Sequence, residues 1–216
     1  MSENDLTFSK KYTATHARKY FRKHQESVGR RLSHWREVGM ARQALRRAGH
    51  PQSVLDLPCG TGRFWELLAE EPGRKLFAAD LNTSMFEMGL KHRSPELTKR
   101  IEAFAASAFS IPKPDDFVEC VFSIRLLHHI EKPEDRMAIL REFKRVSSST
   151  IIISLWIDGN YRAMRLVKKP RRPSHDRFVV PRAVLESEIA QCGLTIVDRV
   201  DFLKYYSMWT AYVLKK

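Results

Sequence analysis

The feature that most restricts the fold of this chain is an apolar segment that runs directly into a turn with two glycines. Residues 53–64 read Ser-Val-Leu-Asp-Leu-Pro-Cys-Gly-Thr-Gly-Arg-Phe. An apolar strand followed by a glycine-containing turn and a helix is the usual ligand-binding junction at the carboxyl edge of an open α/β sheet. Gly60 and Gly62 would let the backbone approach a ligand closely, because a Cβ would block that approach.

Two common phosphate-binding turns do not fit this segment. A dinucleotide-binding loop requires a third glycine three residues after the second, and Trp65 occupies that position. A P-loop requires the pattern GxxxxGK[ST], which the segment lacks. The ligand is therefore expected to be neither a dinucleotide nor a nucleoside triphosphate held by these turns.

Downstream of this turn, the hydrophobic pattern alternates between strands and helices. Short apolar runs predict strands, and three- and four-residue spacings predict helices. The predicted strands are 53–57, 75–79, 101–106, 118–124 and 150–156, and the predicted helices are 63–71, 84–91, 133–146 and 181–192. This alternation predicts an α/β fold with a mostly parallel sheet and helices on both faces. Two late strands, 195–199 and 208–214, are expected to form an antiparallel edge hairpin.

The N-terminal segment has a different character. Residues 15–48 have apolar side chains at helical spacings with arginine and lysine between them, and Gly29 and Gly39 could divide that helix. We therefore expect an N-terminal basic helical cap, 1–50, followed by an α/β domain, 51–216, with a basic insertion at 160–182.

The net charge of +13 is concentrated in the two basic segments. Residues 1–50 carry 12 Lys and Arg against 4 Asp and Glu, and residues 160–182 carry 8 against 1. Residues 51–159 are nearly neutral, with 14 against 16. This asymmetry indicates an anionic partner for 10–47 and 160–182, and a membrane surface, a phosphorylated glycan and RNA all remain open. A lid whose charges are only solvated is the alternative for 10–47.

Cysteine usage and the first residues bear on location. Cys59, Cys120 and Cys192 are widely spaced and form neither a CxxC pair nor a zinc-ligand pattern, so we expect reduced thiols and no metal site. The N-terminus has no apolar stretch of the kind found in secretory signals, and no apolar run is long enough to cross a bilayer. We expect a cytoplasmic protein without a transmembrane segment; peripheral attachment to the membrane stays open.

A carboxylate closes the second predicted strand. Asp80 lies 18 residues after Gly62, at the end of the run Phe-Ala-Ala-Asp. An acid at this place in an α/β nucleotide site can accept hydrogen bonds from both ribose hydroxyls. A carboxylate that only caps the next turn is the alternative.

Together with the Leu-His-His run at 127–129, these motifs resemble the class I S-adenosylmethionine-dependent methyltransferases, in particular the ubiquinone/menaquinone methyltransferase-like branch. The resemblance covers roughly residues 54–154. It implies a three-layer Rossmann-like fold with a mostly parallel seven-stranded sheet, and S-adenosylmethionine as the cofactor. One departure stands inside the glycine turn, where Pro58 replaces the family's usual glycine.

The resemblance also implies roles for single residues. Asp80 would hold the ribose, Leu81 would pack on the adenine, and Asp56 would lie near the methionine amino group, directly or through a water. After the third strand, Ser107 replaces the acid that usually accepts from the adenine amino group. The implied cofactor-binding set is Asp56, Pro58, Cys59, Gly60, Gly62, Asp80, Leu81, Ser107, Ala108 and Ser123.

Residues near the reacting centre follow the fourth strand. The resemblance places Ser123 and Arg125 beside the methyl donor, and makes His128 or His129 a candidate general base for a hydroxyl substrate. Packing or capping is the alternative for both histidines. Arg125, His128 and His129 are therefore the candidate catalytic residues.

The expected function is methyl transfer to a small or lipid- or glycan-linked acceptor, and the basic insertion favours an anionic one. A [DN]PP[YFW] segment after the fourth strand, typical of enzymes that methylate exocyclic base amines, is absent. Cys59 lies in the cofactor loop and not after the fourth strand, where a 5-methylcytosine enzyme carries its nucleophile. An RNA- or ribosome-directed methyltransferase and a non-catalytic cofactor-binding regulator remain as alternatives.

Overall fold

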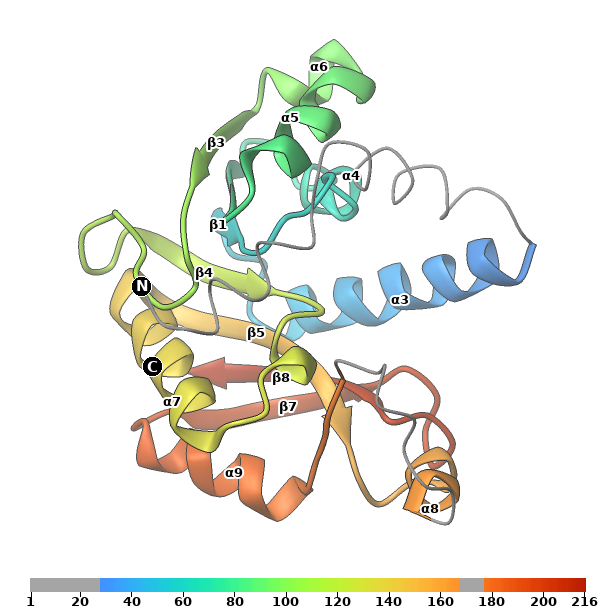
Figure 1. Ribbon diagram of the computed structural model, residues 1–216. Coiled ribbons are helices and arrows are strands. Elements are labelled where there is room, and N and C mark those ends of the chain that lie inside the picture. Colours follow the sequence, from blue (N-terminus) through green and yellow to red (C-terminus); the bar gives the residue numbers. More distant parts are fainter. Residues whose placement is uncertain (1–27, 168–176) are drawn as a thin grey trace.

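The computed structural model describes residues 28–167 and 177–216, which form a mixed β-sheet with helices on both faces (Figure 1). Part of the predicted N-terminal helix, residues 15–27, and part of the basic insertion, residues 168–176, lie outside the described residues.

Strands and helices alternate along the described chain. The helices are α3 (Val28–Arg47), α4 (Trp65–Leu68), α5 (Thr83–His92), α6 (Pro95–Thr98), the 3-10 helix η1 (Leu127–His129), α7 (Pro133–Val146), α8 (Tyr161–Val167) and α9 (Arg182–Gln191). The strands are β1 (Ser53–Asp56), β2 (Lys75–Asp80), β3 (Ile101–Ala105), β4 (Val118–Ser123), β5 (Ser147–Ile157), β6 (Val179–Val180), β7 (Thr195–Asp201) and β8 (Trp209–Lys215).

The sheet has the strand order β3-β2-β1-β4-β5-β8-β7. The pairs among β1 to β5 are parallel, whereas β8 pairs antiparallel with both β5 and β7. The chain leaves β1 toward β2 and β3 and then returns to place β4 on the other side of β1. Such a reversal opens a crevice at the carboxyl ends of the strands, where α/β proteins bind their ligands.

Each face of the sheet has its own hydrophobic core, because successive strand residues point to opposite faces. Leu55 belongs to the core under α7 and α9, and its neighbour Val54 belongs to the core under α3. The three layers are visible in Figure 1, with α7 and α9 on one side of the sheet and α3 on the other. The α/β fold, the parallel centre and the antiparallel terminal hairpin are confirmed.

Helix α7 illustrates why the sequence forms these elements. Pro133 occupies its first turn together with two acidic residues, and two basic residues occupy its last turn, as the helix dipole favours. Ile139, Leu140, Phe143 and Val146 recur at three- and four-residue spacings and are all buried. The predicted bounds, 133–146, match the structure.

Three features differ from the prediction. The sheet has eight strands, because β6 pairs in parallel with the end of β5. Residues 95–98 form a short helix, α6, that was not predicted. Helix α4 covers only four of the predicted nine positions, because Gly60 and Gly62 hold positive φ just before it. After it, Arg74 and Arg100 donate to the carbonyls of Leu68 and Ala69 that a longer helix would use internally.

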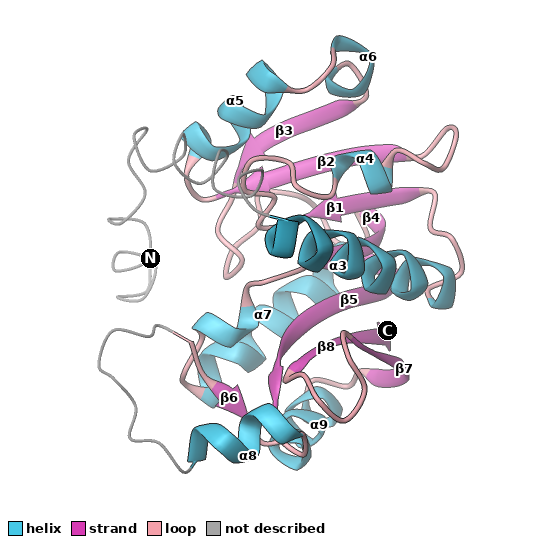
Figure 2. Cartoon of the chain, turned by 90° about the vertical axis from the view of Figure 1, so that its right-hand side faces the viewer, coloured by secondary structure: helices cyan, strands magenta, loops and turns pink. Residues whose placement is uncertain are grey.

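Helix α3 is continuous through Gly39, so the glycine does not divide it. It lies on the face of the sheet (Figure 2), where it packs against β7 and β8 through Met40, Ala41 and Leu45. Its first half projects away from the core, and Trp35 there is 69% exposed. Helix α3 therefore belongs to the layer of helices on this face; the boundary at residue 50 between a cap and a domain stays a prediction.

Candidate functional site

A cavity of about 200 Å³ opens at the carboxyl ends of β1, β2 and β4. Eight of the predicted site residues line it: Pro58, Gly60, Asp80, Leu81, Ser107, Ala108, Arg125 and His129. The five others, Asp56, Cys59, Gly62, Ser123 and His128, are not part of its lining. Residues from four separate loops thus meet around one cavity.

The two glycines of the first turn have different tasks. Gly60, at φ 55°, faces the cavity, and its N–H donates to Asp80 Oδ2 at 3.0 Å. A Cβ there would meet only Met85 Cε, at 3.8 Å, so the missing side chain leaves room on the cavity wall. Gly62, at φ 71°, lies against Trp65, and a Cβ would come within 2.3 Å of the indole. Gly62 therefore accommodates Trp65, and its contact with a cofactor stays a prediction.

Asp80 joins the loops that follow β1 and β2. Its Oδ2 accepts from Gly60, and its Oδ1 accepts from the N–H of Asn82 at 3.0 Å. Asn82 in turn caps α5 by accepting from Ser84. Burial raises the pKa of the Asp80 carboxyl, while these backbone donors oppose that rise. Each oxygen keeps a further lone pair, so the carboxylate can hold the loops and still accept from a ligand.

Asp56 is buried below the cavity, at the end of β1. It is 2% exposed, and among the described residues its Oδ2 has no hydrogen-bond partner. Burial and the neighbouring Asp80 carboxylate raise the pKa of Asp56 well above its usual value. The indole of Trp65 lies close enough to oppose this rise in pKa, but its N–H does not reach hydrogen-bond geometry with the carboxyl. A ligand's donor near Oδ2 would therefore satisfy this buried acceptor better than the protein does.

Cys59 connects the first turn to the sheet. Its N–H donates to the carbonyl of Ala79 at 2.9 Å, and its side chain is buried. Burial and the carboxylate of Asp56 raise the pKa of this thiol well above its usual value. The thiol therefore stays protonated and is a poor nucleophile. The preceding peptide bond, between Leu57 and Pro58, is cis.

The turn after β3 supplies the wall opposite the glycine loop. Ser107, Ala108 and Phe109 all line the cavity. Ser107 Oγ accepts from the N–H of Phe109 at 3.2 Å, and Ala106 donates to the carbonyl of Asp80. Phe109 is thus both a wall of the cavity and a residue packed against the core.

Arg125 follows β4 and has an unusual backbone conformation. Its φ of 75° lies in the left-handed region, which is costly for a residue with a side chain. Its N–H donates to Ser154 Oγ at 3.0 Å, which holds the conformation, and its guanidinium lies 5.2 Å from the centre of the Trp209 ring. This conformation places the side chain in the cavity lining, whereas Ser123 is fully buried.

Glu37, which was not predicted, pairs with two residues of the cavity lining. It is 4% exposed, and it pairs with Arg63 and, at 3.5 Å, with Arg125. Both arginines line the cavity, so one carboxylate from α3 orders two cations of its wall. A signal was present in the sequence, since Glu37 is the only acidic residue in the strongly basic 20-residue helix α3.

Arg63 and Arg177 also line the cavity and were not predicted. Arg63 donates from Nε to His34 Nδ1 at 3.1 Å. Arg177 lies 5.4 Å from the centre of the Trp156 ring. With Arg125 they bring three arginines to the cavity lining, which also contains the carboxylate of Asp80. Glu37 pairs with Arg63 and Arg125 from outside this lining.

The two histidines occupy different environments. His129 lines the cavity. His128 is fully buried against the rings of Trp156 and Trp209, at 5.6 and 4.9 Å between centres, and its two nitrogens have no hydrogen-bond partner among the described residues. Burial lowers the pKa of His128 well below its usual value, and His129 and nearby arginines lower it further. His128 is therefore a neutral core residue, and His129 is the one a ligand can reach.

Comparison with known proteins gives a consistent result. Residues 54–149 match the model of a family described as a methyltransferase domain. A ubiquinone/menaquinone biosynthesis C-methyltransferase of Pectobacterium atrosepticum is 29% identical over 130 residues, 52% of this chain and 50% of that protein. A malonyl-[acyl-carrier protein] O-methyltransferase of Hahella chejuensis is 31% identical over 165 residues, 74% of this chain and 56% of that protein. The chain thus spans about half the length of these curated relatives.

Solved structures share the fold. The magnesium protoporphyrin IX methyltransferase of Synechocystis PCC 6803, with bound SAH, superposes with a TM-score of 0.76 at 13% identity, covering 98% of this chain and 99% of that one. A SAM-dependent methyltransferase from Aquifex aeolicus superposes at 0.58, with 20% identity, over 76% of this chain and 81% of that one. At these identities the likeness establishes the architecture. Within residues 28–167 and 177–216, no helix has the length and apolar character needed to cross a membrane.

Proposed function

We propose that this chain is a class I S-adenosylmethionine-dependent methyltransferase, as its likeness to the methyltransferase-domain model over residues 54–149 supports. It would transfer a methyl group from S-adenosylmethionine to a small or lipid- or glycan-linked anionic acceptor. The observation that carries the proposal is the cavity itself. Its lining combines Gly60 of the glycine turn, the Asp80 carboxylate and three arginines.

The residues present fit the cofactor. Asp80 would hold the ribose hydroxyls with the lone pairs that Gly60 and Asn82 leave free, and Leu81, 37% exposed at the cavity, would cover the adenine. The buried Oδ2 of Asp56 would receive the amino group, a donor that this oxygen lacks among the described residues. Bound there, S-adenosylmethionine supplies a methyl group on a positively charged sulfur, which is already a good leaving group.

The remaining task of the protein is to orient the acceptor and exclude water. Alignment of two reactants in one cavity lowers the barrier because the entropy of bringing them together is lost on binding. Arg63, Arg125 and Arg177 would attract and align an anionic acceptor. An ionised oxygen needs no base, whereas a hydroxyl or an amine would lose its proton to a group such as His129.

The proposal is tested by incubating the purified chain with S-adenosylmethionine labelled in its methyl group and with separate pools of small acids, lipid extract and RNA. We expect label in the acid or lipid pool, and a loss of about tenfold or more when Arg125 is replaced by Gln, as removal of a charge-assisted contact predicts. Label confined to RNA would contradict the acceptor class. Absence of transfer to every pool, with cofactor binding intact, would favour a non-catalytic role.

A further inference from the structure

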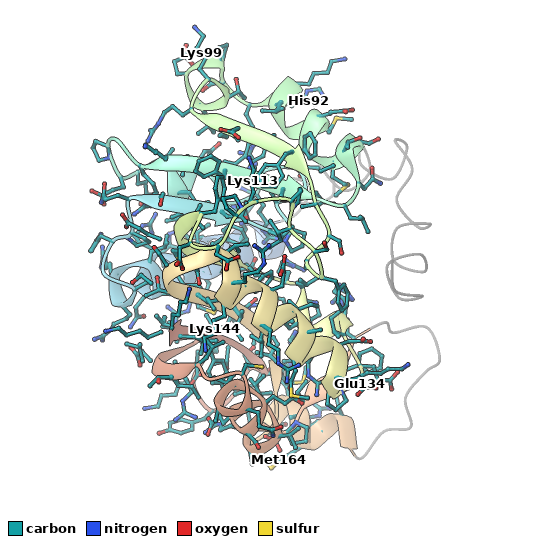
Figure 3. All side chains as sticks on the ribbon, turned by 90° about the vertical axis from the view of Figure 1, so that its left-hand side faces the viewer. His92, Lys99, Lys113, Glu134, Lys144 and Met164 are labelled. Carbon is teal, nitrogen blue, oxygen red and sulfur yellow. The ribbon has the colours of Figure 1, made fainter. Side chains whose placement is uncertain are left out.

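Large apolar side chains are exposed in a cluster on the surface around α8. Six of the eleven exposed large hydrophobic residues in the described part of the chain lie on α8 or on the loop between β7 and β8. They are Tyr161, Met164 and Leu166 of α8, and Leu203, Tyr205 and Tyr206 of the loop. We refer to these six residues as the α8 patch. Figure 3 shows Met164 at the bottom edge of the molecule.

The α8 patch is a built surface, since two segments about 40 residues apart hold each other. The N–H groups of Tyr161 and Arg162 donate to the carbonyls of Tyr205 and Tyr206, at 2.9 and 3.1 Å. The rings of Tyr161 and Tyr206 stack at 5.6 Å. Tyr205 has a φ of 62°, in the left-handed region, and its side chain is 76% exposed. The fold thus maintains a costly conformation that presents an aromatic ring to solvent.

Three cationic side chains lie among these apolar side chains, while Asp198 and Asp201 line a pocket together with Lys204 and Tyr205. Arg162 and Arg165 lie on α8, Lys204 lies in the loop, and neither 161–167 nor 203–206 contains an acidic residue. None of these three cations forms an ion pair with an acidic side chain of the described residues. The α8 patch therefore combines exposed aliphatic and aromatic groups with a surplus of positive charge.

We propose that the α8 patch binds the surface of a lipid bilayer that contains anionic lipids. Aliphatic groups would enter the boundary between the headgroups and the acyl chains from Met164, Leu166 and Leu203. The rings of the tyrosines are amphipathic, which suits the same boundary. Arg162, Arg165 and Lys204 complement the negative headgroups.

The ring contacts favour lipid over RNA as the partner. Tyr161 stacks on Tyr206 and lies 5.8 Å below the guanidinium of Arg165. Lys204 lies 5.0 Å above the ring of Tyr205. Surfaces that bind single-stranded RNA stack bases on free aromatic faces, whereas here at least one face of each of these three rings already contacts another side chain. Aliphatic residues such as Met164 also contribute little to base stacking.

The position of the α8 patch connects it to the cavity. Helix α8 is the next element after β5. Arg177, which lines the cavity, comes shortly before β6, and β6 pairs with the end of β5. Figure 2 shows α8 and β6 in the same corner of the molecule. A bilayer bound to α8 would therefore face the edge at which an acceptor enters; this last point rests on the proposed function, whereas lipid binding itself does not.

Sedimentation with vesicles tests the proposal, with the purified chain and vesicles of phosphatidylcholine alone or mixed with phosphatidylglycerol. We expect binding to the anionic vesicles that is about tenfold or more tighter than to phosphatidylcholine, and sensitive to salt. Met164→Glu and the double change Arg162→Gln with Arg165→Gln should each weaken it about tenfold. The control Trp35→Ala, which removes an equally exposed aromatic residue from α3, should bind as the unchanged chain does.

Titration of each variant with S-adenosylhomocysteine separates the two proposals and reports folding. If the chain binds this nucleoside but not the anionic vesicles, or if Met164→Glu binds vesicles as well as the unchanged chain, the α8 patch is not a lipid surface and the proposed function stands. Binding of RNA that competes with vesicles and depends on Tyr205 would also overturn the lipid assignment. Vesicle binding without nucleoside binding would leave the lipid surface intact and refute the proposed function.

Discussion

At the scale of single residues, the buried carboxylate of Glu37 shows how a distant helix shapes the cavity. It neutralises part of the charge of Arg63 and Arg125 and fixes the direction of both guanidinium groups. A buried ion pair contributes little net stability, but removal of one partner leaves the other charge uncompensated. We interpret Glu37 as a positioning residue for the two arginines.

Replacement of Glu37 by Gln should therefore affect both folding and acceptor binding. We expect the free energy of unfolding to fall by about 1–3 kcal/mol, since Gln keeps some hydrogen bonding but no charge. The KM for the acceptor should rise, while the affinity for S-adenosylhomocysteine stays within about twofold because Arg63 and Arg125 act on the acceptor.

Glu70→Gln is the matched control, since Glu70 pairs with Arg42 of the same helix at an exposed position outside the cavity. Its loss should cost less than about 1 kcal/mol and leave the KM unchanged. Chemical denaturation and steady-state kinetics measure both effects. Equal effects of the two variants on the KM would show that Glu37 has no positioning role.

His128 allows a prediction about pH. Its pKa is lowered in the folded protein, so the unfolded chain binds a proton more readily at mildly acidic pH. The contribution of His128 to the free energy of unfolding is therefore fully present above about pH 6.5, the pKa of histidine in the unfolded chain. It declines as the pH falls below this value, by up to about 1.4 kcal/mol per pH unit. His128→Phe should remove this decline and retain methyl transfer, because a phenyl ring suits the contacts with Trp156 and Trp209.

The relevant measurement is the difference in the free energy of unfolding between the unchanged chain and His128→Phe. It is measured from about pH 7 to about pH 5, the range in which a histidine titrates. Burial and Arg63 also lower the pKa of His34, whereas burial raises that of Asp56, so other groups add slopes of both signs. Those groups remain in both proteins, and the difference isolates His128. Parallel curves would mean that His128 is not held neutral, and loss of transfer would assign it a role in catalysis.

Much of the cavity could be predicted from the sequence, because its parts follow strands. Asp80, Gly60 and Arg125 stand at strand ends, and parallel strands bring such residues to one edge. The pairing of Glu37 with Arg63 and Arg125 could not be predicted, since it depends on where α3 packs, which local patterns do not encode. Which of two adjacent histidines is buried depends likewise on Trp156 and Trp209, far along the chain.

At the scale of elements, the glycine turn before α4 shows that one conformation can serve two purposes. Gly60 and Gly62 both have positive φ, but only Gly60 borders the cavity. The indole of Trp65 occupies the space where a side chain of Gly62 would lie. The turn that leads into α4 therefore needs one glycine to leave room at the cavity and the other to leave room for Trp65.

Gly62→Ala should destabilise the protein by about 3 kcal/mol or more, since it adds a steric clash with Trp65 to the cost of a left-handed backbone. Gly73→Ala provides the control, because Gly73 also has positive φ but no atom lies within 4 Å of the position that its Cβ would take. It should cost only about 1–2 kcal/mol. Thermal and urea unfolding measure the stability of the two variants. Equal losses of stability would show that Trp65 can move aside without cost.

Element types were predicted more reliably than their bounds. The strongly periodic α7 and the apolar β5 were identified because their patterns are long and unmixed. The extent of α4 was overestimated, because Arg74 and Arg100 cap its carbonyls from elsewhere in the fold. The two-residue β6 and the four-residue α6 are too short to have a period, so no local pattern announces them.

At the scale of the whole molecule, a nearly neutral α/β core carries two basic segments, and the described part of each contributes a residue at or next to the cavity. Glu37 of helix α3 pairs with two arginines of the cavity lining, and Arg177, which follows the insertion after α8, lines the cavity itself. A cavity ringed by arginines and a neighbouring apolar, cationic surface suit an anionic acceptor presented at a membrane. This combination unites the two proposals, which remain separately testable.

The central claim is that the cavity holds an adenosyl group through Asp80, and titration calorimetry of the purified chain with S-adenosylhomocysteine tests it most directly. We predict saturable binding at one site, and a loss of affinity of about tenfold or more, about 1.4 kcal/mol, in Asp80→Ala. Asp198→Ala, outside this cavity, should bind as the unchanged chain does. Absence of binding in the unchanged chain, or undiminished affinity in a folded Asp80→Ala variant, would contradict the account.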